Sequence, residues 1–215
     1  MRKWKLAATA FLLVTASLAF AQDDEGKNEL AFTLGAGFAS DNQVVPGAPG
    51  PAAPIDVGNS VVFGASYARR LARTDGAAVY LEFVLAAAPS HRTSSANLGT
   101  IDNVASLFLT PALQVKFAPD STISPWVSGG FGYGLYEGSE TLRDGSVNPD
   151  RREHTGALEF GGGVDIKTPV SILAPISLRL EVRDFYSFDT VNFGRPVRDN
   201  RQHNVVLAGG FLLRF

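Results

Sequence analysis

The feature that most constrains the fold is a two-residue alternation of apolar with small or polar side chains, which recurs eight times from Leu30 to Phe215. Successive side chains of a β-strand point to opposite faces, so each run predicts a strand with one apolar face. The last run reads HNVVLAGGFLLRF, from His203 to Phe215. The predicted strands lie within residues 30–38, 61–67, 78–85, 105–117, 124–138, 158–167, 176–183 and 203–215.

The connections between these runs alternate in length along the chain. Residues 73–76, 118–121 and 169–175 are short links rich in Asp, Pro, Ser and Gly, which favour turns. Residues 41–59, 89–103, 139–153 and 184–201 are longer loops. Short turns at one end and long loops at the other are typical of membrane barrels. The pattern predicts an all-β fold, an eight-stranded antiparallel up-and-down transmembrane β-barrel.

Periodicity alone does not say which face of each strand points outward, because a lipocalin-like soluble barrel would bury its apolar face. The opposite face is rich in Gly, Ala, Ser and Thr, and Gly packs poorly on a solvent-exposed strand. Small residues suit the narrow interior of an eight-stranded barrel. We therefore place the apolar face in lipid. Two residues fit this arrangement badly: Pro111 predicts a bulge or local break, and Trp126 faces inward by parity unless a bulge near Pro125 turns it outward.

The first residues have the pattern of a secretory signal peptide. Basic residues precede an apolar run, and Ala19-Phe20-Ala21 follows as a cleavage site. We expect a cleaved signal peptide at 1–21, a short N-terminal segment at 22–28 and the barrel at 29–215. The sequence has no Cys and no basic stripe, which argues against disulfides, thiolate metal sites and nucleic-acid binding.

Three stretches, SPWVSGGFGYG, ISLRLEVRDF and GGFLLRF, resemble the small bacterial outer-membrane β-barrel superfamily, the OmpA/OmpX-like barrel domain. The resemblance implies a location in the bacterial cell outer membrane, among outer-membrane lipid and lipopolysaccharide. It also implies recognition by periplasmic chaperones and by the barrel-insertion machinery, through Gly209, Phe211, Leu213 and Phe215. We expect a monomer.

Charged residues also fall on the inward face, where a small barrel must pair them because an isolated buried charge is costly. The seven expected to form a network in the lumen are Glu82, Glu159, Asp165, Lys167, Arg179, Glu181 and Arg183. Lys116 and Arg214 share their parity, and the hairpin at 169–175 places Asp165 roughly opposite Arg179. The network is either a gate in a narrow conduit or a plug, and the narrow bore favours the plug.

His91, His154 and His203 fall near the outer ends of strands, close to loop carboxylates. Their spacing matches no lipase or barrel-protease pattern, so we expect no catalytic site, cofactor or metal. The sequence thus predicts an integral outer-membrane barrel with a structural, envelope-integrity or surface-contact role. The alternatives are a narrow channel for small solutes and a hydrolase at the rim acting on lipid or peptide.

Overall fold

The computed structural model describes residues 26–40, 42–44, 53–95, 99–138, 147, 151–171, 175–189 and 201–215. The expected signal peptide and the centres of the long loops lie outside these described residues. No helix within the described part of the chain is long and apolar enough to cross a membrane.

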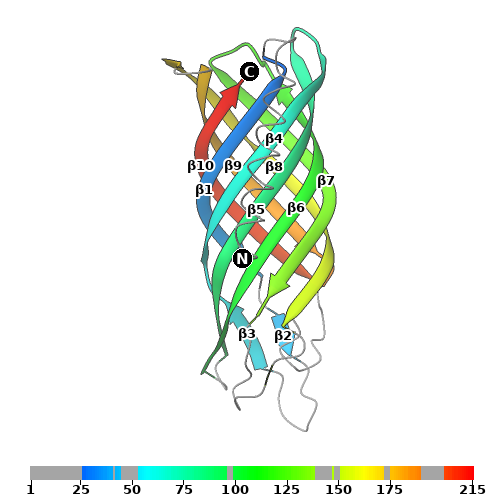
Figure 1. Ribbon diagram of the computed structural model, residues 1–215, viewed down its shortest axis with the longest axis vertical. Helices are drawn as coiled ribbons and strands as arrows, with labels where there is room; N and C mark the ends of the chain where they lie inside the picture. Colours follow the sequence, from blue (N-terminus) through cyan, green and yellow to red (C-terminus); the bar gives the residue numbers. More distant parts are fainter. Residues whose placement is uncertain are drawn as a thin grey trace, which may run out of the picture.

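Eight long strands of the described chain close into a barrel (Figure 1). These strands are β1 (Asn28–Ala39), β4 (Ser60–Arg73), β5 (Ala77–Ser95), β6 (Gly99–Phe117), β7 (Ile123–Glu137), β8 (Arg152–Ser171), β9 (Pro175–Ser187) and β10 (Gln202–Arg214). Each pairs antiparallel with its neighbours in sequence, and β1 pairs with β10 to close the sheet. At this seam Leu30 lies opposite Leu213. The expected all-β antiparallel barrel is confirmed.

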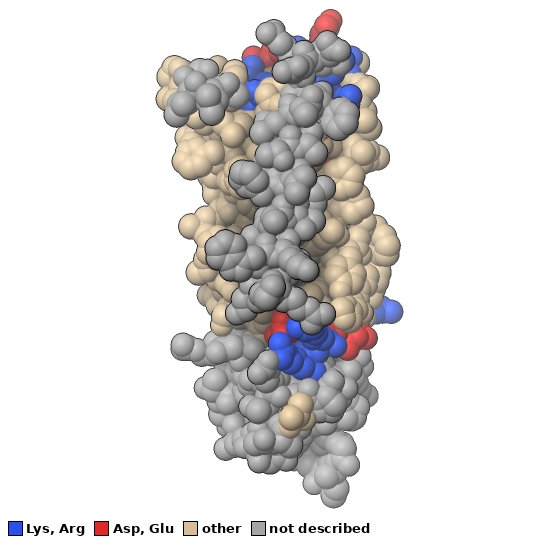
Figure 2. Space-filling view, viewed as in Figure 1, with Lys and Arg blue, Asp and Glu red and all other residues tan. Residues whose placement is uncertain are grey.

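The apolar face of each strand lies on the outside of the barrel. Leu109 is 48% exposed, whereas the next residue, Thr110, is fully buried in the lumen. In Figure 2 the described surface along the middle of the barrel carries no charged residues, which gather at its two ends. A broad apolar belt of this kind is a surface for lipid, and closure satisfies the backbone groups that lipid cannot hydrogen-bond.

The two ends of the barrel differ in the way the sequence predicts. The C-terminus and the start of β1 lie at the upper end in Figure 1, together with the short connections after β4 and β6, the end of β8 and the start of β9. The opposite ends of the eight strands lie at the lower end. By the general rule for membrane barrels, the upper end in this view is periplasmic and the lower end is the outer one.

At the outer end the strands run further than the sequence indicated. β5 and β6 continue through most of the loop expected at 89–103, because a bulge between Ala88 and His91 lets the pairing resume after Pro89. The loop expected at 41–59 contains two short strands, β2 (Asn42–Val44) and β3 (Ala53–Val57). β3 pairs with the extended part of β5 and β2 pairs with β3, so they lie beyond the rim of the barrel (Figure 1).

Pro111 causes a break rather than a bulge. β6 pairs with β7 at Leu109 and again at Ala112, in the same register, but not at the two residues between them. Proline has no N–H to donate, so the ladder is interrupted locally without displacing the strand. Pairing between β6 and β5 continues through Pro111, opposite Phe83.

Candidate functional site: the charged lumen

The centre of the lumen is occupied by buried ionic side chains from three strands, β5, β8 and β9. Asp165 on β8 lies directly opposite Arg179 on β9. The Arg179 guanidinium donates to both carboxylate oxygens of Asp165, from Nε at 2.8 Å and from Nη2 at 3.0 Å. Both side chains are buried. This paired geometry is the strongest form of a charge-assisted hydrogen bond between side chains.

Arg183, four residues further along β9 than Arg179, contacts three carboxylates. Its Nε donates to Glu181 Oε2 at 3.1 Å, and its Nη1 donates to Glu159 Oε1 at 2.7 Å. Its Nη2 donates across the lumen to Glu82 Oε1 at 2.9 Å. Glu82 Oε1 also accepts from Arg179 Nη1 at 3.3 Å, which joins the two arginine clusters. Six of the seven side chains expected in the network are therefore in contact.

Lys167 does not join these six. Its Nζ donates to the backbone oxygen of Asp120 at 2.5 Å, in the turn between β6 and β7 at the periplasmic end. Its parity is inward, as expected, but its position near the end of β8 puts the ammonium at the mouth of the barrel. There it can reach a turn carbonyl and solvent instead of the buried carboxylates.

A second group of charges closes the periplasmic side of the network. Lys116 Nζ lies 2.5 Å from Glu29 Oε2 and 2.7 Å from Asp165 Oδ2. Arg214 donates to Glu29 Oε1 from Nε at 3.0 Å and from Nη2 at 2.8 Å. Sequence reasoning missed Glu29 because it began the first apolar run at Leu30. The parity of Glu29, shared with inward-facing Ala31 and Thr33, was the signal that could have found it.

Trp126 faces the lumen, as its parity indicated. Two guanidinium groups lie over its ring, with Arg179 Cζ 4.9 Å and Arg183 Cζ 4.8 Å from the ring centroid. The pairing of β7 with β8 is continuous through Pro125, so no bulge turns the indole outward. A cation over an aromatic ring is stabilised by the ring quadrupole, and the effect is larger away from water. Trp126 thus fills the central lumen and holds both arginines in place.

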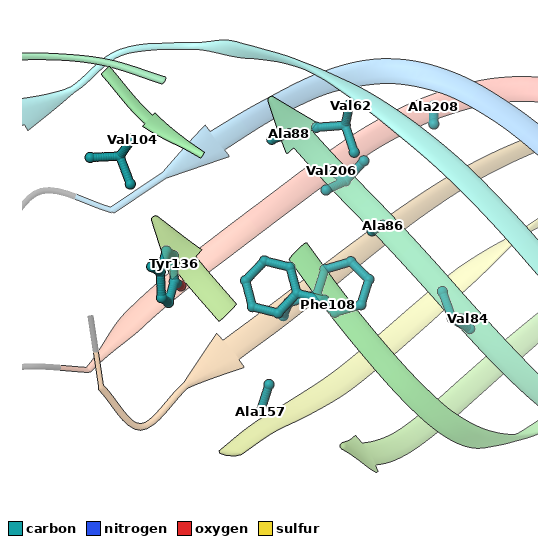
Figure 3. Close-up of a cluster of buried hydrophobic side chains, with 11 residues drawn as sticks. Val62, Val84, Ala86, Ala88, Val104, Phe108, Tyr136, Ala157, Val206 and Ala208 are labelled. Carbon is teal, nitrogen blue, oxygen red and sulfur yellow. The ribbon is translucent and has the colours of Figure 1, made fainter. Parts of the chain in front are cut away.

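The outer half of the lumen is apolar, which the sequence did not predict. Phe108 stacks on Phe185 with ring centroids 4.8 Å apart, and Tyr136 meets Phe108 edge-on at 5.8 Å. Figure 3 shows Phe108 and Tyr136 within the barrel among small side chains such as Ala86 and Ala157. The aromatic layer was missed because residues from 184 onward were assigned to a loop, which left Phe185 out of β9.

Hydrogen bonds hold this aromatic layer at its outer edge. The Tyr136 hydroxyl is 2.8 Å from Ser187 Oγ and accepts from Asn204 Nδ2 at 2.9 Å. Two small cavities lie beside the apolar cluster, each with room for about one water molecule. One of them reaches Glu181 and Arg183. The aromatic layer therefore occupies the outer half of the described lumen.

The two rim histidines whose side chains are described, His154 and His203, lie outside the lumen. His154 contacts the Tyr133 hydroxyl through Nδ1. His203 Nδ1 is 2.6 Å from Asp184 Oδ2, and its ring packs against Tyr186 with centroids 4.7 Å apart. The side chain of His91 lies outside the described residues. The two described rings are thus parts of the outer surface of the barrel wall, on different strands.

Three of the four residues expected to guide insertion lie on the outer face of β10. Phe211 is strongly exposed there, and Gly209 and Leu213 share its parity. Phe215 follows the strand and exchanges two backbone hydrogen bonds of 2.9 Å with Asn28. These bonds help to close the seam between β10 and β1. Their recognition by periplasmic chaperones and by the insertion machinery stays a prediction.

Comparison with known proteins gives a result at the level of structure alone. No family model matches the sequence, and no curated protein sequence matches it. Among solved structures, the outer membrane protein OprG from Pseudomonas aeruginosa aligns with 15% identity and a TM-score of 0.54, covering 89% of this chain and 96% of OprG. Neisserial surface protein A aligns with 12% identity and a TM-score of 0.54, covering 90% of this chain and all of that protein (100%).

The fold is that of a small outer-membrane β-barrel. The lipid-facing exterior agrees with this assignment and with the expected location in the bacterial outer membrane. The expected resemblance to the OmpA/OmpX-like barrels is confirmed as a likeness of fold. Folds of this kind host several activities, so the role of this barrel has to be argued from its own lumen and surfaces.

Proposed function

We propose that the protein is a closed, non-conducting outer-membrane barrel with a structural, envelope-integrity or surface-contact role. The observation that carries the proposal is the double filling of the lumen. Ion pairs joined through Arg179 and Arg183 occupy the centre, and the Phe108–Phe185–Tyr136 layer occupies the outer half. An eight-stranded barrel leaves little free bore once side chains fill it. Ions would have to cross both layers.

The surface-contact part of the proposal is supported by the strands that project beyond the rim. β5 and β6 remain paired as far as Ser95 and Gly99, and β3 and β2 extend this sheet sideways (Figure 1). Paired strands hold their shape better than open loops, so they offer a defined surface outside the membrane. The envelope-integrity part of the proposal is tested by permeability. A strain without the protein should become more permeable to bile salts, and expression of the full-length chain should restore the barrier.

Planar-bilayer recording tests whether the lumen is plugged. The purified barrel should insert without resolvable current steps, and Arg183→Ala should lower stability while the bilayer stays tight. Steady single-channel currents from the wild type would overturn the proposal in favour of a narrow solute channel. Currents from Arg183→Ala alone would identify the network as a gate. Phe108→Ala serves as the companion variant, since it opens the outer layer and leaves the ion pairs intact.

The alternative of a rim hydrolase is tested separately. The His203–Asp184 pair lies on the outer surface of the barrel wall, and a histidine oriented by a carboxylate is one element of a hydrolytic site. We expect lipid A mass spectra to be the same from cells with and without the protein. A deacylated species that disappears with His203→Ala would favour the hydrolase.

A further inference from the structure

The central lumen contains more buried carboxylates than cations to balance them. Within the described residues, five carboxylates of the central lumen are paired with four positively charged side chains, one of which is Arg214. The carboxylates are Glu29, Glu82, Glu159, Asp165 and Glu181, and the cations are Lys116, Arg179, Arg183 and Arg214. The surplus is one negative charge. Burying an uncompensated charge is costly, so we expect one further positive charge close to these carboxylates.

The surplus lies around Arg183. Among the described residues, Arg183 is the only cation paired with Glu181 and Glu159, and it shares Glu82 with Arg179. Arg179 donates its two shorter hydrogen bonds to Asp165. It donates only one, longer hydrogen bond to Glu82. Three carboxylates thus share one full positive charge and part of a second. The missing charge belongs on this side of the network.

Unpartnered oxygen atoms mark the place. Glu82 Oε2 and Glu159 Oε2 are fully buried and have no hydrogen-bond partner, although the other oxygen of each carboxylate is bonded to Arg183. Gln114 Oε1 and Nε2 and Thr110 Oγ1 are also buried without partners, and neither of these two side chains is exposed at all. In Glu181, by contrast, Thr33 and Arg183 bond one oxygen each.

The strand register brings these groups onto one patch of the inner wall. Glu82, Ala112, Gly130 and Glu159 form a single row across β5, β6, β7 and β8. Gln114 and Thr110 flank Ala112 on the same inward face of β6. Diagonal neighbours of this kind are within reach of long side chains. The two middle residues of the row, Ala112 and Gly130, have small or absent side chains. A glutamate lies at each end of the row.

We propose that this patch binds one monovalent alkali cation, Na⁺ or K⁺. The free oxygens of Glu82 and Glu159 would supply the charge, and Gln114 Oε1 and Thr110 Oγ1 would supply neutral ligands. Hard cations take oxygen ligands of this kind, with water completing the shell. A single positive charge also removes the surplus.

A divalent ion fits less well. No group of three or more His, Cys, Asp or Glu side chains suited to a metal ion occurs within the described residues. The site lies in the wall of the lumen and does not depend on whether the lumen conducts, so the bilayer recordings and the following experiments can fail independently.

Thermal unfolding in different salts tests the site in the refolded full-length barrel. Trp126 pairs with Lys116 and Gly163 beside this patch and is the only Trp of the barrel, so its fluorescence reports locally. At equal ionic strength, Na⁺ or K⁺ should raise the melting temperature above that in choline chloride by a few degrees, in a saturable manner. Choline is too large to enter. Equal melting temperatures in all three salts would overturn the proposal.

Substitutions separate this site from a general salt effect. Gln114→Met keeps the shape of the side chain but removes the oxygen. It should raise the cation concentration needed for half of the melting-temperature increase at least tenfold. Gln202→Met, at a buried glutamine near the outer rim, should leave the response unchanged. Glu159→Gln removes the surplus charge, so this variant should melt in choline at the temperature that the wild type reaches in the preferred cation.

Two further results would refute the cation site. If acidification in choline raises the melting temperature and Na⁺ adds nothing, a proton on one carboxyl neutralises the surplus and the cation site is refuted. Crystals of the wild type soaked in Tl⁺ should show an anomalous peak between Glu82 and Glu159. The absence of that peak would refute the site even where the variants fail to fold.

Discussion

Replacing Arg183 by alanine is the sharpest test of the charged lumen. The guanidinium makes three bonds to buried carboxylates, at 2.7, 2.9 and 3.1 Å, and lies 4.8 Å from the Trp126 ring. Alanine removes all of these contacts at once. It leaves Glu159 with only Ser128 as a partner, at 2.9 Å, and leaves Glu82 with one longer bond to Arg179.

The expected cost follows from what is left behind. A hydrogen bond to a charged group contributes about 1.5–3 kcal/mol, but three bonds to one guanidinium are not additive. Removing one partner of a buried ion pair costs about 3–5 kcal/mol, because the other charge stays buried and uncompensated. Arg179 remains beside Glu82 and limits the loss. We therefore expect the free energy of unfolding to fall by about 3–5 kcal/mol.

Urea unfolding in lipid vesicles, followed by the gel shift of heat-modified barrel, measures this change without depending on Trp126. Arg152→Ala is the matched control, because Arg152 pairs with Glu137 at the exposed rim at 3.2 Å. That substitution should cost less than about 1 kcal/mol. Arg183→Lys keeps the charge but has one ammonium for three carboxylates, so its loss should fall between the two. An Arg183→Ala barrel within about 1 kcal/mol of wild type would refute the buried-network argument.

Three further predictions concern the wall, the seam and the outer layer. Leu109→Arg places a charge in lipid and should cost about 2–4 kcal/mol in vesicle unfolding; Thr110→Arg should act by crowding the lumen, and an unchanged Leu109→Arg barrel would contradict the face assignment. Deleting Phe215 removes two backbone bonds at the seam and should reduce the inserted fraction, measured by protease protection, far more than total synthesis. Phe108→Ala should cost about 3–5 kcal/mol in the same unfolding assay, unless the layer collapses to fill the space.

The sequence was sufficient for everything that depends on the local direction of a side chain. The small residues opposite the apolar face placed Leu109 on the outside, and alternation then gave Trp126 an inward parity; the structure has Leu109 exposed and Trp126 buried. The pairing of Asp165 with Arg179 was also within reach, because one hairpin separates the two residues and its turn sets their register. Parity is a property of the extended backbone itself, so no knowledge of the closed barrel is required.

The ends of the strands at the outer rim were harder to predict from the sequence. The polar residues at 89–103 have the composition of a loop, yet β5 and β6 pair through most of them. Phe185 was assigned to a loop for the same reason, since Asp184 before it breaks the apolar run. Backbone pairing with a neighbouring strand decided these cases, and that pairing is indifferent to the polarity that ends a sequence pattern.

Only the closed barrel decided which inward residues meet across the lumen. Glu82 and Arg183 are 101 positions apart, and Glu29 and Arg214 are 185 apart at the β1–β10 seam. The sequence predicted that Glu82, Arg183 and Arg214 face inward, and the parity of Glu29 carried the same information. The stagger of the closed sheet determined which rows lie opposite one another, why three carboxylates converge on Arg183, and why Lys167 is left at the mouth. That stagger is a property of all eight strands together, so no local pattern in the chain encodes it.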